Sequence, residues 1–396
     1  MLDIRLGPPR RHGTLSIIPL VTSGAAELSY LLLADALAAC TLRITEVGSG
    51  MVPRLLADNT GELDVLVLDG EQLIGAKQNR MTNRTILLPG RKRTEIPVSC
   101  MEQGRWRFDS EHFAASPQHS PAKVRRKARD LEAAYVAEGM APADGVLFAA
   151  QGAVWSEIDA VSFRAGSESR SLALDGAFDA SSKEIETWAK AFSPVEGQVG
   201  LVGLTRVGGD ASTGIDAIGM KVIGMDVIGS PVLYARLHER LLRGYIMDAL
   251  DTMRERPRGT TGGGPCASEP TPREDARIDD ATVDNATADN ATVDDATVDD
   301  GAVDDGAVDL LARAQRFLDA VREAERTPAP SVGRGRYEVL SGTVVGGALS
   351  DDALDPERLV HNSAFPLQSG DAPHPSDVPA MNLGPVPPPS TRRRTR

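Results

Sequence analysis

The sequence predicts an α+β protein with an antiparallel, strand-rich core of the meander or sandwich type and several packed amphipathic helices. Three observations lead to this class. Short apolar runs separated by Gly, Pro, Asn and Asp dominate residues 14–101. Long segments with helical periodicity follow, the clearest at 231–254, and strand-like runs return after residue 336. Strands, then helices, then strands indicate α+β, because a doubly wound sheet needs strict alternation.

The N-terminal part reads as a meander of four short strands. The dipeptide Asp69-Gly70 suits the positive φ angles of a type I′ hairpin turn between the first two. A second turn is expected at residues 89–92. The four expected strands are Val65–Leu68, Gln72–Ala76, Arg84–Leu88 and Glu95–Met101. We expect two further strands in the same sheet, Thr14–Leu20 and Leu42–Val47, with a helix at 25–39 between them.

The later elements are mostly helical. A basic helix is expected at 122–138 and another at 151–163, followed by strands at 199–207 and 220–228. Ser230-Pro231 opens the clearest helix, because serine caps a helix N-terminus well and proline fits its first turn. Another amphipathic helix is expected at 310–325.

The net charge of −13 over 396 residues comes from one segment. Residues 259–309 hold 14 acidic and two basic side chains, in a run of acidic pentapeptide repeats without large apolar residues. Such a segment buries too little surface to offset its ordering entropy, so we expect it to be disordered. The Pro- and Arg-rich tail at 367–396 is expected to be disordered too. The rest is close to neutral, which argues against a dedicated nucleic-acid binder.

Residue types that bind metals or cofactors are not arranged in a known motif. The three cysteines are too widely spaced for a disulfide framework or a zinc site, and no two histidines fall at metal-ligand spacing. His361 closes the last strand and is expected at the edge of the core. We therefore expect no cofactor and no metal. No apolar run is long enough for a signal peptide or a membrane span, so we expect a cytoplasmic protein.

The densest polar stretch is Lys77-Gln78-Asn79-Arg80, which follows a glycine at position 75. Amide and guanidinium groups supply directional donors suited to a carboxylate, a phosphate or a sugar. These four residues are therefore candidate ligand-binding residues. The alternative is a solvated loop or strand end.

A second candidate stretch ends the predicted strand 95–101. Glu102 is the carboxylate there that could act as a general base, and Arg105 and Trp106 could bind a charged or planar ligand group. The alternatives are an Arg–Glu pair that holds the strand end and a tryptophan at the edge of the core. Cys100 is expected to be a buried structural thiol.

The segments 69–80 and 96–106, with the sequences DGEQLIGAKQNR and IPVSCMEQGRW, resemble the ARG and Rhodanese-Phosphatase-superfamily-associated protein domain (ARPP) family. Residues 151–155, 224–250 and 360–365 are similar to that family as well. The resemblance covers residues 5–255 and 310–366. It implies one domain over 1–366, with 259–309 as an insertion inside it. It also strengthens the two candidate stretches, although no established catalytic residue can be carried over.

The resemblance implies a role beside ADP-ribose or nucleotide-sugar metabolism. One hypothesis is a ligand-binding or hydrolytic domain that acts on an anionic, sugar-containing small molecule. The alternative is a non-catalytic module that binds partner proteins, such as ADP-ribosylglycohydrolase-type enzymes. Whether the protein is an enzyme stays open.

Overall fold

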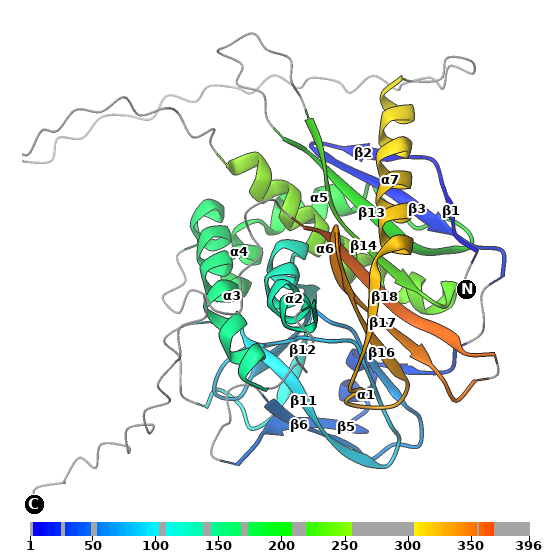
Figure 1. The fold of residues 1–396 in the computed structure, drawn as a ribbon. Helices are drawn as coiled ribbons and strands as arrows, with labels where there is room; N and C mark the ends of the chain where they lie inside the picture. Colours follow the sequence, from blue (N-terminus) through cyan, green and yellow to red (C-terminus); the bar gives the residue numbers. More distant parts are fainter. Residues whose placement is uncertain are drawn as a thin grey trace, which may run out of the picture.

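The computed structural model describes residues 3–24, 28–48, 54–102, 108–137, 144–167, 173–207, 219–255, 305–354 and 356–367. Within these ranges it contains helices and mainly antiparallel strands, which confirms the predicted α+β class (Figure 1). The acidic segment as far as residue 304 and the tail from residue 368 lie outside the described residues. No helix in the described part of the chain is long and apolar enough to cross a membrane.

The largest sheet of the described structure has nine strands. Its neighbours in space are β1 (Arg5–Leu6), β3 (Leu15–Val21), β13 (Gln198–Val207), β14 (Gly219–Ile228), β18 (Arg358–Pro366), β17 (Val344–Asp351), β16 (Arg336–Ser341) and β15 (Glu325–Ala329), with β2 (Arg10–His12) paired to β3. The prediction that residues 14–20 join the meander was wrong, because β3 pairs with β13. The C-terminal strands belong to the same sheet as the N-terminal ones, since β18 pairs with β14.

Helices cover both faces of this sheet. On one face lie α2 (Ala122–Ala137) and α6 (Pro231–Arg254), and α3 (Asp144–Ala165) packs against α2. Apolar residues of these helices share a core with Leu201, Tyr337 and Phe365. On the other face lies α7 (Asp305–Glu323), whose Ala314 and Leu318 pack with the opposite side chains of the same strands. Figure 1 shows α7 running along this second face. Side chains of a strand alternate between the two faces of the sheet, so consecutive residues of β14 and β18 pack into the cores on opposite faces.

Two smaller sheets hold the N-terminal polar stretches. The six-stranded sheet consists of β12 (Phe113–His119), β8 (Glu71–Gly75), β9 (Arg80–Thr82), β11 (Lys92–Cys100), β6 (Arg54–Asn59) and β5 (Leu42–Glu46). The three-stranded sheet consists of β10 (Ile86–Leu88), β7 (Val65–Val67) and β4 (Leu31–Leu32). These are the strands of the described residues.

The predicted hairpin at Asp69-Gly70 was wrong. The strand before this turn, β7, pairs with β10 and β4, whereas β8 after it pairs with β9 and β12. The turn itself is real, because Gly70 has a φ of +85°. Its backbone N–H donates to the carbonyl of Thr82, on β9, so the chain changes sheets at this point.

The predicted helices were confirmed where the helical spacing of apolar residues was most regular. The Ser230 hydroxyl accepts the Leu233 N–H at the start of α6, as predicted. The helix expected at 25–39 is shorter, because α1 spans Leu33–Ala38 and follows strand β4. Two short helices were missed, α4 (Leu174–Ala180) and α5 (Ser182–Ala189).

Candidate functional site

The structure brings the first predicted stretch close to the second. Strands β9 and β11 pair with Arg80 opposite Cys100. The Gln78 side-chain amide donates to the Glu102 carbonyl at 2.7 Å and accepts from Arg80 Nη1 at 2.6 Å. Gln151 of α3 closes the group, since its amide exchanges two hydrogen bonds with the backbone of Cys100, at 2.7 and 2.9 Å. Segments from three parts of the chain therefore meet here.

The side chains of this first group are turned toward the protein interior. Arg80 is 0% exposed, and its guanidinium lies 3.6 Å from the Glu46 carboxylate. Gln78, Asn79 and Glu102 are also buried. Asn79 donates to Asp175 at 2.7 Å and accepts the Gly75 N–H. These hydrogen bonds and the ion pair hold the ends of the strands in place.

Lys77 is half-buried, and its amino group lies 5.2 Å from the centre of the Phe108 ring. Arg105 and Trp106 lie outside the described residues, so their predicted roles stay predictions. Burial raises the pKa of the Cys100 thiol to about 11, against the opposing effect of Arg80. The thiol is therefore protonated at neutral pH, as expected for a structural cysteine.

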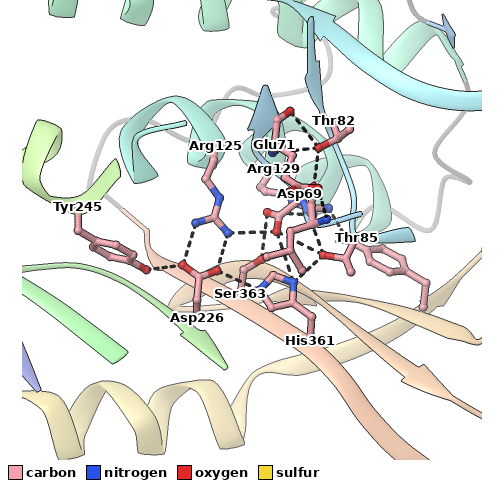
Figure 2. A network of polar contacts seen from close by, with 12 residues as sticks. Asp69, Glu71, Thr82, Thr85, Arg125, Arg129, Asp226, Tyr245, His361 and Ser363 are labelled. Atoms are coloured by element: carbon pink, nitrogen blue, oxygen red, sulfur yellow. Dashed lines mark hydrogen bonds and ion pairs between the residues drawn. The ribbon is translucent and has the colours of Figure 1, made fainter. Parts of the chain in front are cut away.

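A second polar group lies deeper, where α2 and α6 meet the nine-stranded sheet. We call it the buried ionic cluster; its members are Asp69, Thr85, Arg125, Arg129, Asp226, Tyr245, His361 and Ser363. Figure 2 shows Arg125 between the two aspartates. Its guanidinium donates to Asp226 at 2.6 and 2.9 Å and to Asp69 at 3.0 Å. His361 lies between Asp226, at 3.0 Å, and Thr85, at 2.6 Å.

Both aspartates of the cluster are held in the ionised form. Burial by itself raises the pKa of a carboxyl group, but arginines outweigh it here. Arg125 and Arg129 keep the pKa of Asp69 well below its usual range, and Arg125 does the same for Asp226. Nearby His119 stays neutral, because burial and Arg125 lower its pKa to about 3.

Asp69, Asp226 and His361 supply the ligand atoms that a divalent metal ion would use, all within 4.8 Å of one another. The same carboxylate oxygens already accept hydrogen bonds from Arg125. Two arginines also balance the two carboxylates, so a divalent ion would add charge to a group that is already neutralised. The arrangement therefore fits a cluster that ties β14, β18, α2 and the Asp69 turn together better than it fits a metal centre.

A pocket of about 520 Å³ opens on the opposite face of the same strands. Its apolar wall is formed by side chains of β14, α7 and β18, namely Met225, Val227, Leu318, Val321 and Leu359. It lies beside the C-terminal end of α7, where the helix leaves part of this sheet face uncovered. The volume falls within the range typical of small-molecule sites.

Four arginines and two glutamates line this pocket, which we call the arginine pocket: Arg322, Arg326, Arg336, Arg358, Glu338 and Glu357. Arg336 pairs with Glu357 at 2.9 Å, and Arg326 with Glu338 at 3.4 Å. Arg358 makes no ion pair within the described part of the chain. The lining therefore carries a net positive charge, and its ion pairs are exposed enough for an incoming anion to replace them.

Sequence reasoning missed both the cluster and the pocket. One signal was present, because Asp226 is an acidic residue inside the apolar run Met225–Ile228. A buried carboxylate in a strand requires a partner, and Arg125 on the basic helix supplies it. For the pocket, Arg336 and Glu338 alternate with apolar residues on β16, but only the sheet order places them near Arg358.

Comparison with known proteins gives one match. A family model described as ARPP-1, the ARG and Rhodanese-Phosphatase-superfamily-associated Protein domain, matches residues 3–299. No curated protein and no solved structure matches the chain. The matched region ends before α7, although the sheet continues to β18.

Proposed function

Because the chain belongs to the ARG and Rhodanese-Phosphatase-superfamily-associated Protein domain family, we propose that it is a cytoplasmic module that binds an anionic small molecule in the arginine pocket. This proposal rests on one observation: an apolar wall and four arginines line the same pocket of about 520 Å³. Guanidinium groups bind phosphates and carboxylates through two parallel hydrogen bonds, which gives both affinity and orientation.

We propose a ligand related to ADP-ribose, because the resemblance to this family implies a role beside ADP-ribose or nucleotide-sugar metabolism. An ADP-ribose derivative carries phosphates for the arginines and rings for the apolar wall. Among the described lining residues no carboxylate is paired with a histidine, so the function that we propose for this pocket is binding.

We assign a structural role to the segments around Gln78 and Glu102. Arg80 is fully buried among Glu46, Gln78 and Cys100. We propose that Gln78, Asn79 and Arg80 fix the β9–β11 junction, and that any direct ligand contact in this region comes from the more exposed Lys77 together with Arg105 and Trp106.

Titration calorimetry with ADP-ribose, NAD and nucleoside phosphates tests the proposal. We expect binding that weakens as salt is raised, and a loss of about tenfold or more in affinity for Arg336→Gln and for Arg358→Gln. Arg93→Gln is a matched control, because Arg93 is an exposed arginine paired with Asp58 on the six-stranded sheet. Equal affinity in all three variants, or no binding of any of these anions, would rule the proposal out.

The second candidate is a non-catalytic module that binds partner proteins, and the association named in the family description favours it. In that case the arginine pocket takes no small anion. Pull-down with an ADP-ribosylglycohydrolase-type enzyme would then succeed equally with wild type and with the Arg336→Gln variant.

A further inference from the structure

We infer that the ligand of the arginine pocket is a phosphate ester of a sugar or nucleoside, and that Asn362 selects it. This inference rests on the proposed function, because it names the class of anion that the same pocket takes. The residue that carries it, Asn362, is an uncharged polar member of the pocket lining.

Asn362 reaches the pocket because of strand alternation. It lies on β18 between His361 and Ser363, whose side chains join the buried ionic cluster on the other face of the sheet. Its own side chain therefore points to the pocket face, where it lines the hollow. Val227 of β14 and Ala348 of β17 are its partners in the two neighbouring strands.

The Asn362 side chain is nearly enclosed, and none of the described residues forms a hydrogen bond with it. The residue is 8% exposed. Its side-chain oxygen is buried without a hydrogen-bond partner, and within the described residues its amide group makes no hydrogen bond at all. A buried amide without a partner is costly, and an apolar side chain would suit a site between a valine and an alanine better. An amide here is explained if a ligand pairs with it.

The pocket therefore offers three kinds of contact. The arginines bind an anionic group, the apolar wall packs against a ring, and the side-chain NH2 group of Asn362 can donate to a hydroxyl or carbonyl oxygen. A fatty acid satisfies the first two and leaves Asn362 unpaired, whereas inorganic phosphate satisfies the arginines alone. A phosphorylated sugar or nucleoside satisfies all three, and a volume of about 520 Å³ can hold one.

Sites that hydrogen-bond a buried ligand group discriminate strongly against analogues that lack it. The test is titration calorimetry of the full chain with three probes: ADP-ribose, inorganic phosphate and dodecanoate. For wild type we expect ADP-ribose to bind at least about tenfold more tightly than either other probe. In Asn362→Leu, ADP-ribose should lose about tenfold to a hundredfold in affinity, while the affinity for inorganic phosphate stays unchanged.

The outcomes separate the two proposals. If no probe binds wild type, or if Arg358→Gln changes nothing, the proposed function itself fails. If ADP-ribose binding depends on Arg358 but Asn362→Leu leaves it unchanged, the arginine pocket stands and the role of Asn362 is overturned. Tighter binding of dodecanoate than of ADP-ribose would also overturn it.

A measurement of thermal stability without ligand distinguishes a role of Asn362 in binding from a role in holding the fold. Because the Asn362 amide has no hydrogen-bond partner among the described residues, Asn362→Leu and the smaller Asn362→Val should melt at or above the wild-type temperature. If both variants unfold or melt well below wild type, Asn362 holds the fold and the inference is wrong.

Discussion

At the scale of single residues, Arg125 matters most to the described structure. It is 2% exposed and joins Asp69, in the turn between β7 and β8, to Asp226 on β14 of the nine-stranded sheet. Removing one partner of a buried ion pair leaves an uncompensated charge, which costs far more than the pair contributes when intact. The stability of the molecule should therefore be unusually sensitive at this position.

We expect Arg125→Met to lower the free energy of unfolding by about 3–5 kcal/mol, because two buried carboxylates lose their shared partner. The matched control is Arg93→Met, which breaks an exposed pair and should cost less than about 1 kcal/mol. Urea unfolding monitored by circular dichroism gives both values. Similar losses of unfolding free energy in the two variants would show that the buried ionic cluster contributes no more to stability than an exposed ion pair.

A double-mutant cycle with Asp226→Asn extends this test. If Arg125 and Asp226 act as a pair, the double variant should lose clearly less than the two single losses together. Additive losses would mean that the two side chains stabilise the fold independently.

Gly70 is the second sensitive residue. It has a φ of +85°, and a Cβ there would lie 2.6 Å from Arg125 Cδ and 2.8 Å from a ring carbon of His119. Gly48 also has a positive φ, +58°, but faces open space. Gly48→Ala should therefore cost about 1 kcal/mol for backbone strain alone, and Gly70→Ala several times more. Thermal melting compares them, and equal costs would contradict the close packing at Gly70.

At the scale of elements, α2 begins against a side chain of another helix. The Asp248 carboxylate, on α6, accepts the backbone N–H groups of Ala122 and Lys123 at 2.6 and 3.2 Å. These are N–H groups that a helix leaves unpaired at its start. Burial raises the pKa of Asp248 to about 7, against the opposing effects of Lys123 and the two N–H groups.

This pKa predicts a pH dependence of stability. The carboxyl group binds its proton more tightly in the folded chain than in the unfolded one, where the pKa is 3.8. Its contribution is therefore complete below about pH 4 and is lost as the pH rises to about 7, by an amount on the order of a few kcal/mol. In Asp248→Asn this decline should be absent. Urea unfolding of both proteins from pH 4 to pH 8 measures it, and parallel profiles would refute it.

Elements with strong local signals were predictable, and those set by tertiary contacts were not. The helix α6 combines a serine cap, proline and a continuous apolar face, and it was found with its correct start. The Asp69-Gly70 turn was recognised too, but its strands pair with distant partners, β7 with β10 and β8 with β12. The sequence around a turn determines the bend of the backbone. Which strands pair depends on the packing of cores whose residues come from distant parts of the chain.

The same distinction applies to the sites. The segments around Gln78 and Glu102 were both candidates from the sequence, and the structure places them in contact. Burial of Arg80 could not be foreseen, because Glu46 reaches it from β5. The arginine pocket combines residues of β14, α7, β15, β16 and β18, which are far apart in the chain, so no local pattern could show it.

At the scale of the whole molecule, the sheet joins segments on both sides of residues 256–304. The family match ends at residue 299, but β18 pairs with β14 and His361 contacts Asp226. We propose that the acidic segment is an insertion within one domain, as the resemblance implies.

Two altered chains test this organisation. A chain that ends at residue 299 lacks α7 and β15–β18, so we expect it to show no cooperative thermal transition. A chain in which residues 259–303 are replaced by about 20 Gly/Ser residues should melt within a few degrees of wild type. Circular dichroism melting decides both cases, and a stable first chain or an unfolded second one would contradict the single domain.

The measurement that bears most directly on the arginine pocket is hydrogen–deuterium exchange with and without ADP-ribose. We expect slower exchange at the end of α7, in β15 and β16 and across residues 356–362, with no change across 77–102. Slower exchange confined to residues 77–102 would place the binding site at the segments first indicated by the sequence, and would rule out binding in the arginine pocket.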